Sequence, residues 1–195
     1  MFAQQVSSPM NVDLAKVKYS FRSGCFHSVF EDAENALKRD SCNRVILLYY
    51  KAVSRGMNGH YKECIDDLEF LRKAHRLLEY PVISALQYFY TELVTNNQDM
   101  EKLRVASKAA FQCIQIEGAI LAAEFFLWVS GNYFKASRCL DEISGIRNNA
   151  EKEIRRVSLW LEVASNGEFT EGDAALGLEY AEESNDLDCL MALTK

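Results

Sequence analysis

Apolar residues recur at spacings of three and four along much of the chain, which is the period of one face of an α-helix. Charged residues such as Lys62 and Asp66 fill the positions between them. We therefore predict amphipathic helices in three segments whose apolar positions are Phe26, Val29, Ala33 and Ala36; Tyr61, Cys64, Leu68 and Leu71; and Tyr133, Ala136, Leu140 and Ile143.

Two other segments, Val45 to Tyr50 and Ala119 to Val129, are apolar almost all round. A helix of that kind is buried between neighbours on several sides. We predict that these segments are the inner helices of a stack. The chain has only two prolines and nine glycines in 195 residues, and such sparse punctuation favours long helices.

A turn of one form recurs along the chain: a glycine followed two residues later by an aromatic residue. The four copies are Gly24-Cys25-Phe26, Gly59-His60-Tyr61, Gly131-Asn132-Tyr133 and Gly167-Glu168-Phe169. The glycines are separated by 35, 72 and 36 residues, so one turn near residue 96 lacks its glycine. Asn96 and Asn97 stand there, and asparagine also tolerates the left-handed conformation. The spacing is close to the tetratricopeptide period of about 34 residues.

The sequence therefore predicts an all-α fold, a tetratricopeptide-like right-handed α-solenoid of antiparallel helix hairpins. Residues 1–10 are expected to be a flexible leader and residues 11–195 a single solenoid of about five hairpins. The start of a sixth hairpin follows from Leu187, without the polar capping helix that ends a solenoid, so we expect a piece of a longer array.

The third repeat departs from the pattern. Tyr88, Phe89 and Tyr90 stand at positions where small residues are usual, and we predict irregular packing there. Pro81 is expected at the start of the first helix of this repeat, where proline costs no hydrogen bond.

Charge and cysteine content narrow the possible functions. The net charge is −6, and residues 157–195 carry one Lys and nine Asp or Glu, so nucleic-acid binding has no electrostatic support. The acidic end is either a partner surface or a solvated helix face.

The longest apolar stretch is too short for the roughly 20 residues that span a bilayer. The six cysteines form no close pair, which predicts buried thiols in a reducing, cytosolic compartment.

The sequence contains no motif of nucleotide binding, metalloprotease or nucleophilic catalysis, so we predict no enzyme and no catalytic, cofactor or metal residues. A binding groove is expected instead, because the first helices of such solenoids line the concave face. The candidate groove residues are Tyr49, Val53, Leu121, Phe125 and Trp128. The alternative is that these residues form the core between repeats. The cationic clamp that holds terminal carboxylates is missing, which predicts an apolar or helical ligand.

Three segments carry a resemblance to a known family: Phe125 to Ala136, Leu47 to Leu71 around Gly59, and Leu159 to Glu162 before Gly167. Together with the inserted Thr170 to Gly172, they are similar to the N-terminal region of the tetratricopeptide repeat protein 21 family. The likeness covers roughly residues 40–195.

The resemblance implies a scaffold subunit of intraflagellar transport complex A. Such a subunit acts in cilium assembly and retrograde ciliary transport, in the cytoplasm, the cilium and the ciliary base. Its expected partners are other subunits and helical or extended peptide segments, with no nucleic acid and no membrane insertion. The alternative is a generic cytosolic adaptor that holds an apolar or helical peptide in its groove.

Overall fold

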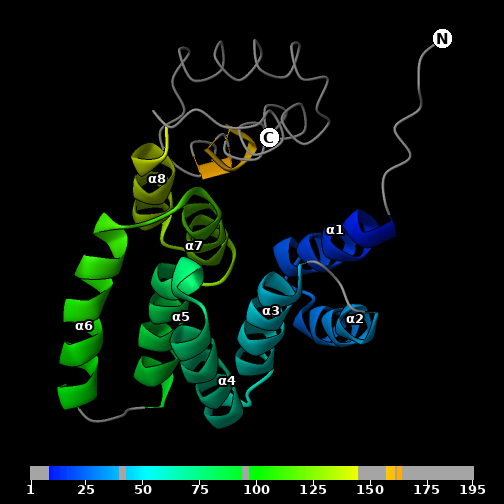
Figure 1. Ribbon diagram of the computed structural model, residues 1–195, viewed down its shortest axis with the longest axis horizontal. Coiled ribbons are helices and arrows are strands. Elements are labelled where there is room, and N and C mark those ends of the chain that lie inside the picture. The colour runs from blue at the N-terminus through cyan, green and yellow to red at the C-terminus, as the bar shows by residue number, and fades with distance from the viewer. Residues whose placement is uncertain (1–8, 40–42, 94–96, 145–156, 161, 164–195) are drawn as a thin grey trace. The chain divides into compact units, whose positions relative to one another are not determined.

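The computed structural model describes residues 9–39, 43–93, 97–144, 157–160 and 162–163 (Figure 1). The chain divides into two compact units, residues 1–112 and 113–195. The first unit contains α1 (Pro9–Arg22), α2 (Phe26–Lys38), α3 (Arg44–Met57), α4 (Tyr61–Ala74), the 3-10 turn η1 (Arg76–Leu78), α5 (Glu79–Glu92) and α6 (Asn97–Gln112). The second contains α7 (Ile116–Trp128) and α8 (Tyr133–Glu142). All regular elements within the described ranges are helical, which confirms the predicted all-α class.

The helices of the first unit are arranged as stacked hairpins. Each helix packs against the next along the chain, and α1 also contacts α3, and α3 contacts α5. No contact joins α2 to α4 or α4 to α6 in this unit's described part. The hairpins therefore stack mainly by packing the second helix of one against the first helix of the next, and their first helices also touch one another (Figure 1).

The predicted glycine turns end the first helices. Gly24 has a φ of +70° and Gly59 a φ of +90°. After α1, the Gly24 N–H donates to the Phe21 carbonyl at 3.1 Å and the Cys25 N–H to the Ser20 carbonyl at 2.9 Å. This pair of bonds is the Schellman motif, and the same pair follows at Gly59. A Cβ at either glycine would meet open space, so the positive φ is what requires glycine.

The turn in the second unit is built differently. Gly131 again has a positive φ, of +63°, but the Asn132 N–H reaches back to the Phe126 carbonyl at 2.7 Å. Asn132 also caps α8, because its side chain accepts a hydrogen bond from the Lys135 backbone N–H at 3.0 Å. The predicted turn at Gly167 lies outside the described residues.

The predicted apolar faces are buried except for the aromatic residue that begins each one. Helices α2 and α4 bury the expected residues from Val29 to Ala36 and from Cys64 to Leu71, and α7 is buried all round from Gly118 to Leu127. Phe26 and Tyr61 are half-buried, and Tyr133 is 39% exposed.

The prediction of buried cysteines holds for two of the four cysteines that the structure describes. Cys64 and Cys139 are buried free thiols, whereas Cys25 and Cys113 are exposed. Both exposed residues lie where helices meet turns, Cys25 at the start of α2 and Cys113 just after α6. Cys42 and Cys189 lie outside the described residues.

The third repeat accommodates its large aromatic residue through a glycine in its neighbour. Phe89 of α5 is fully buried, and it lies against Gly56 of α3. A Cβ on Gly56 would stand 2.5 Å from Phe89 Cε1 and 2.8 Å from Cys64 Sγ. Pro81 is the third residue of α5, still within the first turn, where its missing N–H has no helical partner to lose.

The predicted domain limits are only partly covered by the structure. Helix α1 begins at Pro9, one residue before the expected end of the leader. The chain reverses between α5 and α6, where the turn without glycine was expected, although residues 94–96 lie outside the described ranges. The start of a sixth hairpin also lies outside them. One solenoid over residues 11–195 stays a prediction.

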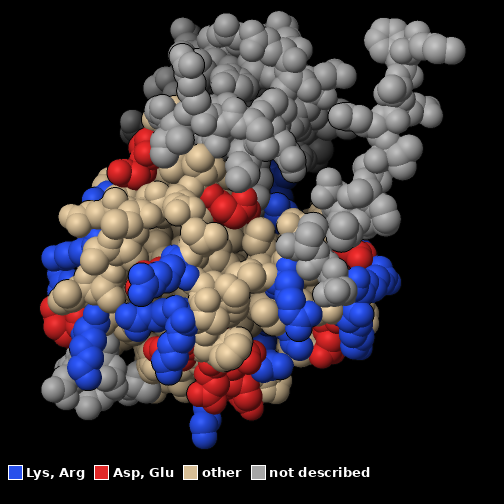
Figure 2. Space-filling model, viewed as in Figure 1, with Lys and Arg blue, Asp and Glu red and all other residues tan. Residues whose placement is uncertain are grey.

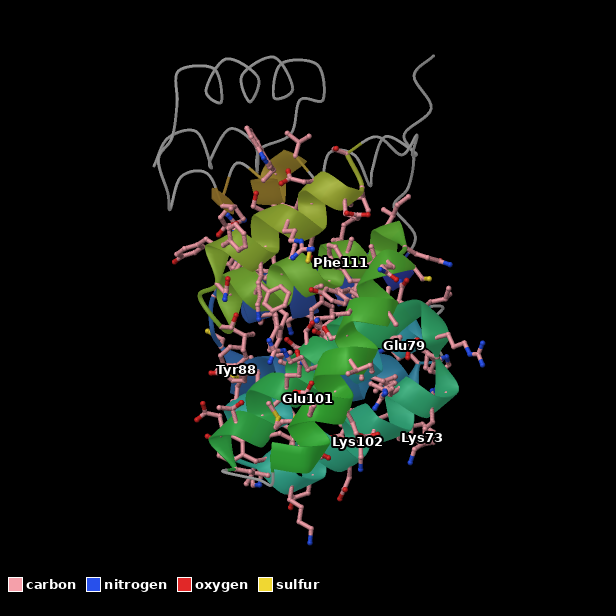
Figure 3. The ribbon with its side chains drawn as sticks, turned by 90° about the vertical axis from the view of Figure 1, so that its left-hand side faces the viewer. Lys73, Glu79, Tyr88, Glu101, Lys102 and Phe111 are labelled. Carbon is pink, nitrogen blue, oxygen red and sulfur yellow. The ribbon has the colours of Figure 1, made fainter. Side chains whose placement is uncertain are left out.

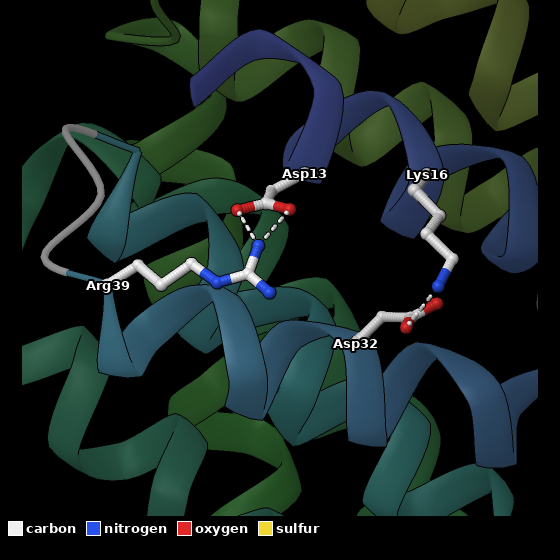
Figure 4. Close-up of polar contacts among 4 residues, drawn as sticks. All are labelled: Asp13, Lys16, Asp32 and Arg39. Carbon is white, nitrogen blue, oxygen red and sulfur yellow. Dashed lines mark hydrogen bonds and ion pairs between the residues drawn. The ribbon is translucent and has the colours of Figure 1, made fainter. Parts of the chain in front are cut away.

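Two ion pairs hold the first hairpin in register (Figure 4). Arg39, at the end of α2, donates to both carboxylate oxygens of Asp13 in α1, at 2.9 and 3.0 Å. Lys16 of α1 donates to Asp32 of α2 at 2.8 Å. Both pairs are partly exposed, so each contributes about 0.2–1 kcal/mol.

We predict that Gly56→Ala destabilises the protein by about 1–3 kcal/mol, because the new methyl group overpacks the contact with Phe89. The sign of the change in unfolding free energy is informative, because a glycine-to-alanine change in a helix with free space around it stabilises by roughly 0.5–1 kcal/mol. Denaturant unfolding measures the change.

The control is Gly56→Ala combined with Phe89→Leu, which removes the ring that the methyl group meets. We expect the double variant to lose less stability than the two single variants together. Strictly additive losses would contradict the proposed contact.

Candidate partner-binding site

The five predicted groove residues come from the first helices of hairpins in both units. Tyr49 and Val53 belong to α3, and Leu121, Phe125 and Trp128 belong to α7. The first four have no exposed surface, and Trp128 is half-buried. As placed, only Trp128 of this set can be reached by a partner. Partner binding by these residues stays a prediction.

The buried members of α3 take part in an aromatic cluster between hairpins. The Tyr50 ring meets the Phe21 ring of α1 edge-on with centroids 4.9 Å apart, and the Tyr49 centroid lies 6.0 Å from that of Tyr50. Phe26, the aromatic that follows the first turn glycine, meets Phe21 edge-on at 5.6 Å. Here the aromatic residues pack the contact between adjacent hairpins, the alternative that the sequence left open.

Trp128 ends α7 with its polar edge turned into the second unit. Its Nε1–H donates to Glu162 Oε1 at 3.2 Å, and Glu162 is only 8% exposed. The contact joins two segments on which the family resemblance rests, Phe125 to Ala136 and Leu159 to Glu162. The residue as a whole is half-buried and so keeps some accessible surface. The residue can therefore support the local packing and contact a partner at the same time.

A polar cluster that the sequence did not predict joins α2, α3 and α4. Lys51 donates to Glu34 at 3.1 Å and Arg55 donates to Asp67 at 2.6 Å. The two cations also lie over the Phe30 ring, at 5.1 and 5.2 Å from its centroid. Lys51 lowers the pKa of Glu34, first through their hydrogen bond and then through its charge.

This cluster aligns two hairpins and offers no catalytic chemistry. Its signal in the sequence is a pair of four-residue spacings, Phe30 with Glu34 and Lys51 with Arg55, which places each pair on one helix face. Which two faces meet depends on the packing of α2 against α3, so the spacings alone could not identify it.

Cys64 is a buried thiol with a shifted pKa. Burial raises the pKa of Cys64 to about 12, which keeps this thiol protonated and unreactive. Within the described ranges, no group of three or more His, Cys, Asp or Glu residues could hold a metal ion. No helix among the described residues is long and apolar enough to cross a membrane.

A comparison with known protein families identifies the family of this chain. The family model described as "Tetratricopeptide repeat protein 21 N-terminal ARM repeat" matches residues 17–195. The chain belongs to this family. No curated protein matches the sequence.

Membership in the tetratricopeptide repeat protein 21 family confirms the resemblance drawn from the sequence. The family description names ARM repeats, and the turn glycines here are 35 and 36 residues apart, closer to the tetratricopeptide period than to the armadillo period of about 40–47. Both repeat types are solenoids in which each unit contacts its neighbours. The fold is a helical repeat scaffold.

We predict that Trp128→Phe destabilises the protein by about 1–2 kcal/mol. The variant keeps an aromatic ring but removes the N–H that donates to the buried Glu162 carboxylate. Thermal unfolding measures the loss.

A double-mutant cycle with Glu162→Leu supplies the control. Once Glu162 is replaced, Trp128→Phe should cost clearly less than in the wild-type background. An equal cost in both backgrounds would show that the indole N–H does not act through Glu162.

Proposed function

We propose that this chain is the N-terminal part of a scaffold subunit of intraflagellar transport complex A. In this role it acts in cilium assembly and in retrograde ciliary transport. The observation that carries the proposal is the family match over residues 17–195. The proposed locations are the cytoplasm, the ciliary base and the cilium.

The arrangement of hairpins supports a role in binding other proteins. The second helix of one hairpin packs against the first helix of the next, and the exposed side chains of helices such as α4 are left for partners. The proposed partners are other protein subunits of the transport complex. We propose no catalysis, no nucleic-acid binding and no membrane insertion.

The competing proposal, an adaptor that holds an apolar peptide in a concave groove, has less support. It requires Tyr49, Val53, Leu121 and Phe125 to face a ligand, and all four are fully buried. Trp128 remains our proposed contact for a partner, because it alone in that set has accessible surface. A scaffold that binds through its outer surfaces needs none of the other four to be accessible.

The test is purification of the tagged chain from ciliated cells, followed by identification of the retained proteins by mass spectrometry. We expect the other subunits of complex A to be recovered with the wild-type chain. The matched control is Gly56→Val, which disrupts the packing of α3 against α5 and should lose them.

A chain that is folded by circular dichroism and retains no transport subunit would contradict the proposal. Cells depleted of the protein give a second readout: returning cargo should accumulate at the ciliary tip, since retrograde transport carries it away from there. Normal cargo distribution after depletion would rule out a role in retrograde transport.

A further inference from the structure

The outer face of α4 carries a stripe of exposed residues with an unusual composition. Glu63, Asp66, Phe70 and Lys73 follow one another at spacings of three, four and three, which places them on one side of the helix. All four are exposed, and the Phe70 side chain is 65% exposed. Leu77, in η1 just beyond α4, is 62% exposed. The stripe thus places apolar side chains within a charged surface.

The sign of the charges changes along this stripe. Glu63 and Asp66 lie in the first half of α4, beside the exposed Lys62, whereas Lys73 lies in its last turn and Arg76 follows in η1, after the extended residue His75. Figure 2 shows acidic side chains over the lower part of α4, a basic one at its lower tip and basic ones over its upper end. Figure 3 shows Lys73 from the side, directed outward from the helix.

These four charged groups are not engaged within the fold. None of Glu63, Asp66, Lys73 and Arg76 forms a salt bridge with another residue of the described part. The helix dipole favours acids at the start and bases at the end of a helix. That preference accounts for the charges, but it does not account for Phe70, whose large apolar surface is exposed between them.

The stripe is complementary to itself when it is reversed. Asp66 and Lys73 are equally far from a point between Glu69 and Phe70. A second α4 laid antiparallel about this point would place Asp66 of each copy opposite Lys73 of the other. Phe70 adjoins this point, so both copies would place it next to the axis. In a two-fold dimer, every contact between one residue of the first copy and another residue of the second is repeated with the two copies exchanged, and this surface allows that.

Other partners fit this surface less well. An anionic membrane or a nucleic acid would be attracted by Lys73 and Arg76 but repelled by Glu63 and Asp66 on the same face. The net charge of −6 adds to that repulsion. A surface with both signs in mirrored order matches a partner with the same order reversed, and a second copy of this chain supplies it.

We propose that two copies of this chain associate through the outer faces of their α4 helices, antiparallel, with Phe70 at the centre. The Asp66–Lys73 pair forms twice, once on each side of the axis. Because one helix face buries less than the roughly 1,200 Å² of a standard interface, the dimer is weak and dissociates on dilution. This association does not depend on the proposed ciliary role.

Analytical ultracentrifugation of the full 195-residue chain over a range of concentrations tests the proposal. The wild type should shift from the 22.2 kDa monomer towards twice that mass as concentration rises. Asp66→Lys and Lys73→Glu should each weaken association by roughly tenfold, since each change creates two like-charge contacts by symmetry. The double variant Asp66→Lys with Lys73→Glu should restore association, because it exchanges the charges without removing the pairs.

Phe70→Ser removes the central contact and should also abolish the shift. The matched control is Phe134→Ser, since Phe134 is 79% exposed in α8 and lies outside the stripe. A chain that stays monomeric at every concentration overturns the proposal. So does a dimer that survives Phe70→Ser or that the double charge exchange fails to restore, because either result places the interface elsewhere.

Discussion

The first unit depends on the close approach of α3 and α5, where the Phe89 ring occupies the space that a side chain at position 56 would need. Because Gly56 leaves that space open, a full aromatic side chain can be buried between successive hairpins without pushing them apart. The same relation between first helices joins α1 to α3, where Phe21 packs against Tyr50. In both contacts, burial of an aromatic residue joins one hairpin to the next, and this burial is the main source of stability in such a stack.

The surface properties follow from this arrangement. Tyr49, Val53, Leu121 and Phe125 are buried in the packing of the helices, while Trp128 and the outer face of α4 keep accessible surface. The charged residues also fall into two groups, those engaged between hairpins and those on an outer face. Lys51 and Arg55 are engaged between hairpins, over the Phe30 ring, whereas those on the outer face of α4 remain available. A helical repeat scaffold of the tetratricopeptide repeat protein 21 family therefore presents its surface for assembly with other proteins.

Local features of the fold could be predicted from the sequence, while features that depend on two distant segments could not. The turn glycines were predictable because a positive φ is a property of one residue and its neighbours, as Gly24 and Gly59 show. Amphipathic helices such as α4 were predictable from their period. The fit of Phe89 against Gly56 was not, because nothing local indicates which glycine a ring will meet. Whether the candidate groove residues face a partner could not be predicted, for a related reason. In a helix that is apolar all round, such as α7, periodicity cannot separate a side chain facing a ligand from one facing another helix.

Hydrogen exchange of the wild-type chain, followed helix by helix with mass spectrometry, tests the central claim that α3, packed against helices of both neighbouring hairpins, is the best-protected helix of the first unit. Helix α3 contacts α1, α2, α4 and α5, whereas α2 contacts only α1 and α3 within the described part of this unit. The account predicts that the amides of α3 exchange slowest in the first unit and that those of α2 exchange measurably faster. Equal protection of the two helices, or faster exchange in α3 than in α2, would contradict it.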